Sequence, residues 1–82
     1  MTPDDVLALL RSAVQTVLEI DPQTVTLQTR FVEDLKADSL ALVEIVEILE
    51  EQVARPGFRI DDEDLDALET VGQAVAYALA RL

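Results

Sequence analysis

A single serine, Ser39, stands where an acidic loop gives way to a helical pattern in the stretch EDLKADSLALVEIVEILEE, residues 33–51. The preceding Asp38 is a good N-cap, so the pattern predicts a helix that begins beside Ser39. A phosphate ester on the serine hydroxyl would face the unpaired N–H groups and the positive dipole end of that helix. Ser39 is therefore either a second capping residue or a site of modification, since both interpretations use the same geometry.

The chain lacks the residues on which most enzymes depend. Its 82 residues include no cysteine and no histidine, so they supply neither a thiol, nor the commonest metal ligand, nor the usual general base. The acidic run DDEDLD, residues 61–66, lacks the glycine and the terminal glutamate of an EF-hand loop. We expect one small domain, residues 1–82, with no metal site, no deep cleft and no catalytic side chain.

Charge limits the partners that the protein can bind. Seventeen acidic residues against six basic ones give a formal net charge of −11, which repels nucleic-acid phosphates and anionic membrane surfaces. No apolar run reaches membrane-spanning length, and the first residues are acidic where a signal peptide would be basic. We expect a cytoplasmic protein that binds neither nucleic acid nor membranes and whose partners carry basic surfaces.

The hydrophobic pattern predicts four helices, over residues 3–19, 38–54, 61–68 and 70–82. Capping residues precede the first and the last of them, and the third is long enough for only one or two turns. The irregular segment 20–37 is a long connection of a kind that is often functional or contains a short helix. The pattern as a whole predicts an all-α fold, a small four-helix bundle with a long loop between helices one and two.

The apolar residues within these segments predict which faces are buried. In the last helix, Gly72 is expected to allow a close approach in the first turn, and Tyr77 to be half-buried with its hydroxyl at the surface. The expected buried face of the second helix consists of Leu40, Val43, Val46, Leu49 and Val53.

The run FVEDLKADSLALVEIVEILEE, residues 31–51, resembles the hallmark of acyl carrier proteins: an aromatic-led acidic loop, then Asp-Ser-Leu, then Val-Glu and an acidic helix. The resemblance extends to the length, the acidity and the helical layout of nearly the whole chain. It implies that Ser39 carries a 4′-phosphopantetheine arm, installed from coenzyme A by a separate Mg²⁺-dependent phosphopantetheinyl transferase. The arm supplies the thiol that holds acyl groups as thioesters, so a non-catalytic protein without cysteine suits this chemistry.

The same resemblance implies a surface for partner enzymes. Asp38 and Leu40 flank the attachment serine and would be recognised by the transferase. Acidic side chains spread over one broad side of the second helix, where acyltransferases, ketosynthases and other acyl-processing enzymes would meet a monomeric carrier with basic docking patches. An ordinary solvated face is the alternative, and on either interpretation charge reversal at these glutamates should leave the fold intact. The implied partner-binding residues are Asp38, Leu40, Val43, Glu44, Glu47, Glu50 and Glu51.

Three departures from the family pattern leave alternatives open. Lys36 stands where many relatives have glycine or another small residue, Ala41 and Leu42 replace a polar pair and lean toward polyketide carriers, and the segment 54–57 lengthens the loop after the second helix. The acyl groups could therefore belong to fatty-acid or to polyketide biosynthesis. A peptidyl carrier fits less well, because KADSL lacks the Gly-Gly-His/Asp-Ser pattern. From a different class, the chain could be an unmodified acidic helical interaction domain.

Overall fold

A computed structural model describes residues 1–53 and 55–82 of the chain. It contains three α-helices, α1 (Pro3–Leu18), α2 (Ser39–Gln52) and α3 (Val71–Ala80), and two 3₁₀-helices, η1 (Pro22–Thr24) and η2 (Asp62–Ala67). Over those two ranges the only β pairing is an isolated antiparallel bridge between Arg30 and Thr70. The predicted all-α fold is confirmed.

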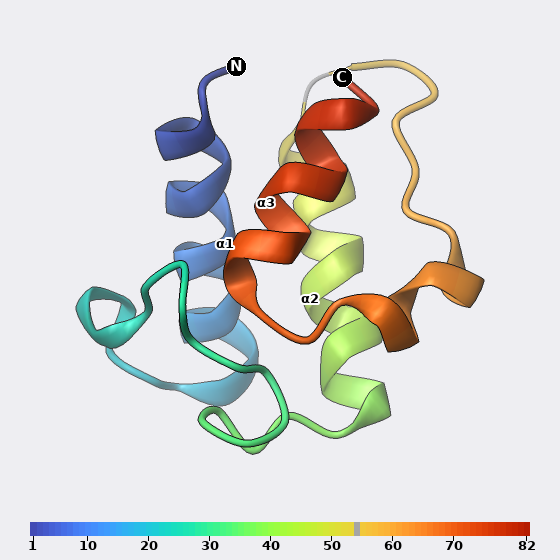
Figure 1. Ribbon diagram of the computed structural model, residues 1–82. Helices are drawn as coiled ribbons and strands as arrows, with labels where there is room; N and C mark the ends of the chain where they lie inside the picture. The colour runs from blue at the N-terminus through green and yellow to red at the C-terminus, as the bar shows by residue number, and fades with distance from the viewer. Residues whose placement is uncertain (54) are drawn as a thin grey trace.

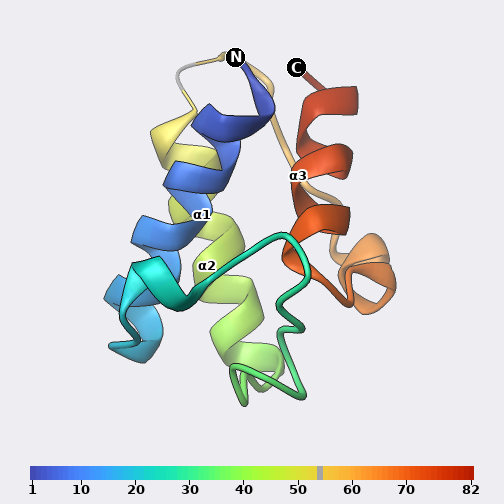
Figure 2. The same cartoon turned by 60° about the vertical axis from the view of Figure 1, so that its left-hand side comes forward.

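The three α-helices lie side by side, with α1 antiparallel to α2 and α3 (Figures 1 and 2). Both α2 and α3 pack against α1. The two chain termini lie at one end of the bundle, and α2 begins at the opposite end, beside the long connection from α1 (Figure 1). Ser39, as the first residue of α2, therefore lies far from both termini.

The core is built from one apolar stripe of each helix. The buried residues of α1 and α3 recur at short steps along each helix, so one side of each helix faces the core. Loop residues complete the core from both connections, as Val25, Phe31 and Leu35 do from the first and Phe58 and Ile60 from the second. The buried residues of α1 and α3 are Val6, Leu10, Ala13, Val14, Val71, Ala74, Val75 and Ala78.

The buried face predicted for the second helix is confirmed at Leu49 and Val53 but wrong in the first half of the helix. Leu40, expected in the core, is 66% exposed, and Val43 and Val46 are only half-buried. Apolar residues lie on most sides of this helix, so their spacing alone fits more than one buried face. The residues of α2 that face the core are Ala41, Ile45 and Leu49, followed by Val53 at the C-cap.

The predicted third helix is the 3₁₀-helix η2 rather than an α-helix. Leu65 within η2 and Leu68 at its C-cap are three positions apart, which matches the three residues per turn of a 3₁₀-helix. The second predicted helix ends at Gln52 in the structure, and Ala54, at its expected end, lies outside the described residues. The long loop was expected to be functional or to contain a short helix, and it contains the 3₁₀-helix η1.

Backbone hydrogen bonds join the long loop to the start of α3. The N–H of Phe31 donates to the carbonyl of Glu69 at 3.0 Å, and the N–H of Val71 donates to the carbonyl of Thr29 at 2.9 Å. The N–H of Gly72 donates to the carbonyl of Leu27 at 2.8 Å, and a Cβ at Gly72 would lie 2.9 Å from that oxygen. The close approach expected at Gly72 is confirmed, and only glycine fits it without a shift.

We expect Gly72→Ala to destabilise the protein by about 1–3 kcal/mol, because the added methyl group must push the loop away from α3. Helix propensity alone predicts the opposite sign, a gain of up to about 1 kcal/mol. Urea unfolding followed by circular dichroism measures the difference, and Ala76→Gly, at an exposed position of α3, reports the propensity effect in the same helix. A more stable Gly72→Ala variant would show that the loop does not press on α3.

Candidate functional site at the start of α2

Ser39 is the first residue of α2, and its side chain is exposed. The helix is capped by Asp38, whose Oδ1 accepts a hydrogen bond from the N–H of Ala41 at 2.8 Å. Over residues 1–53 and 55–82, no described hydrogen bond involves the Ser39 hydroxyl. The interpretation of Ser39 as a second capping residue is therefore wrong, since the hydroxyl is not used by the fold.

The backbone around Ser39 presents positive charge density. The N–H groups of Ala41 and Leu42 are taken up by the side chain and the carbonyl of Asp38. Those of Ser39 and Leu40 have no acceptor among the parts of the chain that the structure describes, as is normal for the first turn of a helix. Together with the helix dipole, these two donors make the surroundings of the Ser39 hydroxyl suitable for an anionic group such as a phosphodiester.

The segment that leads into α2 is fixed from its core side. Leu35 and Ala37 are buried, and the N–H of Ala37 donates to the carbonyl of Phe31 at 2.9 Å. Between them Lys36 is exposed and has a φ of 57°, in the left-handed region that favours glycine. This turn directs the chain outward to Asp38 and Ser39, so the position of the serine is set by the loop as well as by the helix.

The residues predicted to bind partners are exposed or half-buried. Asp38, Leu40, Glu44, Glu47 and Glu51 are exposed, whereas Val43 and Glu50 are half-buried. Leu40 is one of the few large apolar side chains with most of its surface in solvent, and it directly follows Ser39. The exposed members thus extend from the N-cap of α2 to its last turn.

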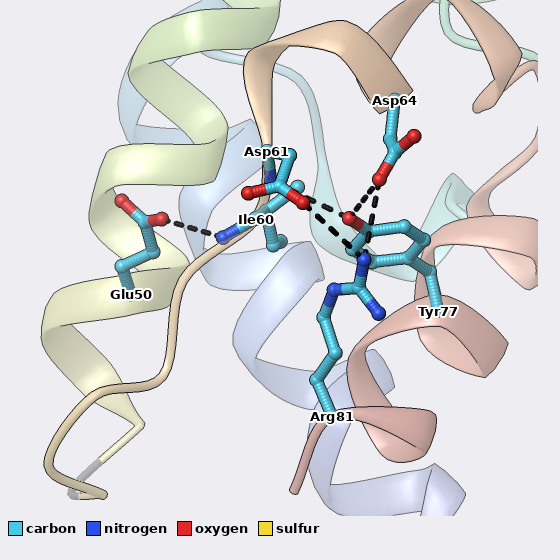
Figure 3. Close-up of polar contacts among 6 residues, drawn as sticks. All are labelled: Glu50, Ile60, Asp61, Asp64, Tyr77 and Arg81. Atoms are coloured by element: carbon cyan, nitrogen blue, oxygen red, sulfur yellow. Dashed lines mark hydrogen bonds and ion pairs between the residues drawn. The ribbon is translucent and has the colours of Figure 1, made fainter.

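Glu50 makes a structural contact that the sequence did not indicate. Its Oε2 accepts a hydrogen bond from the backbone N–H of Ile60 at 2.8 Å, and Ile60 is 5% exposed (Figure 3). The carboxylate therefore satisfies a buried donor in the connection between α2 and η2. The expectation that the charge of Glu50 could be reversed without disturbing the fold is wrong for this reason.

A groove runs between the C-terminal half of α2 and the segment 55–61. Val43, Val46, Phe58 and Ile60 contribute apolar surface to it, and Arg55, Arg59 and Asp61 line it from the segment opposite α2. The sequence indicated a longer loop at residues 54–57 but gave no signal that the chain would fold back along α2. The glutamates that line the same groove are Glu47, Glu50 and Glu51.

A polar cluster holds η2 against α3 (Figure 3). The Tyr77 hydroxyl donates to Asp64, and the guanidinium of Arg81 lies 3.9 Å from the centre of the Tyr77 ring while it donates to Asp64 at 3.2 Å. Partial burial and the hydrogen bond to Asp64 raise the pKa of Tyr77 above its ordinary value of 10.0. The half-burial expected for Tyr77 is confirmed, but its partners were not foreseen.

Comparison with known proteins shows the family. Residues 8–78 match the family described as the phosphopantetheine attachment site. The acyl carrier protein of Rhodococcus erythropolis is 42% identical over 76 residues, which cover 93% of this chain and 80% of that protein. The chain belongs to the acyl carrier protein family. The function as a carrier and the 4′-phosphopantetheine cofactor follow from this membership, and the exposed, unused hydroxyl at the start of α2 fits such a group.

Other relatives of this carrier extend the comparison. The meromycolate extension acyl carrier protein of Mycolicibacterium smegmatis is 42% identical over 76 residues, covering 93% of this chain and 74% of the relative. Its namesake from Mycobacterium tuberculosis is 39% identical over 77 residues, covering 94% of this chain and 64% of the relative. Within the described part of the carrier, no helix combines the length and the apolar character needed to cross a bilayer.

We expect Glu50→Lys to lower the free energy of unfolding by about 1–3 kcal/mol, because the buried N–H of Ile60 loses its acceptor. Glu47→Lys makes the same change of charge one turn away, at an exposed position, and should cost no more than about 0.5 kcal/mol. Glu50→Gln keeps an acceptor oxygen and should fall between the two. If urea unfolding gives the two lysine variants equal stabilities, the hydrogen bond from Ile60 to Glu50 does not stabilise the fold.

Proposed function

We propose that this protein carries acyl intermediates as thioesters on a 4′-phosphopantetheine arm joined to Ser39. The observation that supports this assignment is the state of the hydroxyl groups. All six threonine hydroxyls take part in described hydrogen bonds, and the Tyr77 hydroxyl is bonded to Asp64. Only Ser12 and Ser39 remain, and Ser12 lies inside α1, away from the unpaired N–H groups of a helix start.

The attachment is a phosphoryl transfer that a separate phosphopantetheinyl transferase catalyses. The Ser39 Oγ forms a bond to the pantetheine-side phosphorus of coenzyme A, the diphosphate P–O bond breaks, and the nucleotide leaves. The hydroxyl proton passes to a base of the transferase, since the chain has no histidine and the neighbouring Asp38 carboxylate caps α2 through the N–H of Ala41. The first-turn N–H groups of α2 and its dipole then favour the negative charge that arrives on Ser39.

The exposed side of α2 is the proposed docking surface for acyl-processing enzymes. Leu40 offers an apolar contact next to the arm, and Glu44, Glu47 and Glu51 offer negative charge to acyltransferases and ketosynthases with basic patches. Fatty-acyl rather than polyketide intermediates are supported by the relatives named for meromycolate extension. The resemblance to polyketide carriers depended partly on Ala41. This residue is 9% exposed and faces the core, so it does not contribute to a partner surface. Monomeric state and cytoplasmic location stay predictions.

Ser39→Ala should prevent modification, because no other hydroxyl stands in the same surroundings. Intact-mass measurement after incubation with coenzyme A, Mg²⁺ and a phosphopantetheinyl transferase should show one phosphopantetheine increment on the wild type and on the matched control Ser12→Ala. The Ser39→Ala variant should show none and should lose at most about 1 kcal/mol of stability, because Asp38 remains to cap α2. An increment on Ser39→Ala would refute the assignment.

Glu44→Lys should slow modification by the transferase and acyl transfer by partner enzymes, mainly by slowing association. The loss should be largest at low salt and should shrink as ionic strength rises, because screening acts within about 10 Å at 0.1 M salt. Asp4→Lys, which changes the net charge equally on α1, is the control and should leave the rates unchanged. If both variants react at the wild-type rate at low salt, the glutamates form only a solvated face.

A further inference from the structure

Lys36 combines an unusual backbone with an uncommitted charge. It is the only lysine of the chain, it is exposed, and its φ of 57° lies where residues other than glycine are uncommon. An outlier of this kind next to a functional position is a reason to look for a role of its side chain. Glycine adopts this backbone without the steric cost of a Cβ, so the turn itself does not require lysine.

The carboxylates nearest to Lys36 in sequence are already committed to other groups. Glu33 pairs with the guanidinium of Arg30, Asp34 accepts the backbone N–H of Arg30, and Asp38 caps α2 through the N–H of Ala41. Among the ion pairs described over residues 1–53 and 55–82, none includes Lys36. Its ammonium group is thus a free positive charge in a protein with a net charge of −11.

Lys36 is also within reach of whatever is attached to Ser39. Three residues span at most about 10–11 Å between their Cα atoms, and the left-handed turn at Lys36 makes this segment less than fully extended. The four-carbon stem of lysine is flexible and covers most of that distance. A phosphodiester on Ser39 would then lie between the first-turn N–H groups of α2 on one side and this ammonium group on the other.

We propose that Lys36 forms an ion pair with the phosphodiester of the arm on Ser39, an inference that rests on the proposed attachment at Ser39. The pair holds the near end of the arm at the start of α2. It also offsets the negative charge that modification adds to an already acidic protein. Lys36 is therefore a positioning residue for the arm.

The test is a comparison of apo and modified protein in the wild type, Lys36→Gln and Lys36→Arg. Intact mass first confirms that each modified sample carries one arm. The quantity compared is the melting temperature of the modified protein minus that of the apo protein. At low salt this difference should be about 1–5 °C lower in Lys36→Gln than in the wild type, and Lys36→Arg should resemble the wild type. Arg55→Gln is the matched control, because it removes one exposed positive charge beyond the far end of α2, outside the screening length at 0.1 M salt.

A second readout follows the phosphorus directly. The ³¹P resonance of the modified Lys36→Gln variant should differ from that of the wild type at low salt, and the difference should close at about 0.5 M salt, where surface pairs are screened. Equal melting shifts and equal ³¹P resonances in modified wild type and Lys36→Gln would overturn the role of Lys36 while leaving Ser39 as the attachment site. Absence of the arm from the wild type would overturn both.

Discussion

The junction between the long loop and the start of α3 is the constraint on which the rest of the structure depends. Three backbone hydrogen bonds, from Phe31, Val71 and Gly72, join segments that are about half a chain apart in sequence. The junction buries Phe31 and holds the turn that delivers Asp38 and Ser39 to the start of α2. Because glycine at position 72 lets the two backbones meet, the serine is presented by a fixed scaffold rather than by a loose connection.

At the start of α2, two neighbouring residues divide two tasks. Asp38 caps α2 by accepting the N–H of Ala41, and the Ser39 hydroxyl takes no part in the cap. A modification of the serine therefore leaves the cap in place. The reactive thiol comes with the cofactor, which explains how a family member without cysteine or histidine can act in acyl transfer. On the proposed attachment at Ser39, the acidic side of α2 would present the arm and the negative charge to partner enzymes together.

Much of this arrangement could be predicted from local sequence, and the failures have physical causes. Capping residues and one-sided stripes placed α1 and α3 correctly, since such signals depend only on neighbours in sequence. The buried face in the first half of α2 could not be predicted, because Leu, Val and Ile occur around most of that helix and only packing against α1 selects Ala41 and Ile45. Likewise, the hydrogen bond from Ile60 to Glu50 could not be predicted, because it joins residues that only the folded connection after α2 brings together.

Native-state hydrogen exchange is the measurement that tests the central claim, namely that the junction between loop and α3 holds the serine in place. We expect the amides of Phe31, Val71 and Gly72 to exchange as slowly as core amides of α1 such as those of Leu10 and Val14, because all open in the same global event. Fast exchange at the three junction amides, with Leu10 and Val14 still protected, would contradict the account. Ser39 would then sit on a connection that opens independently of the core.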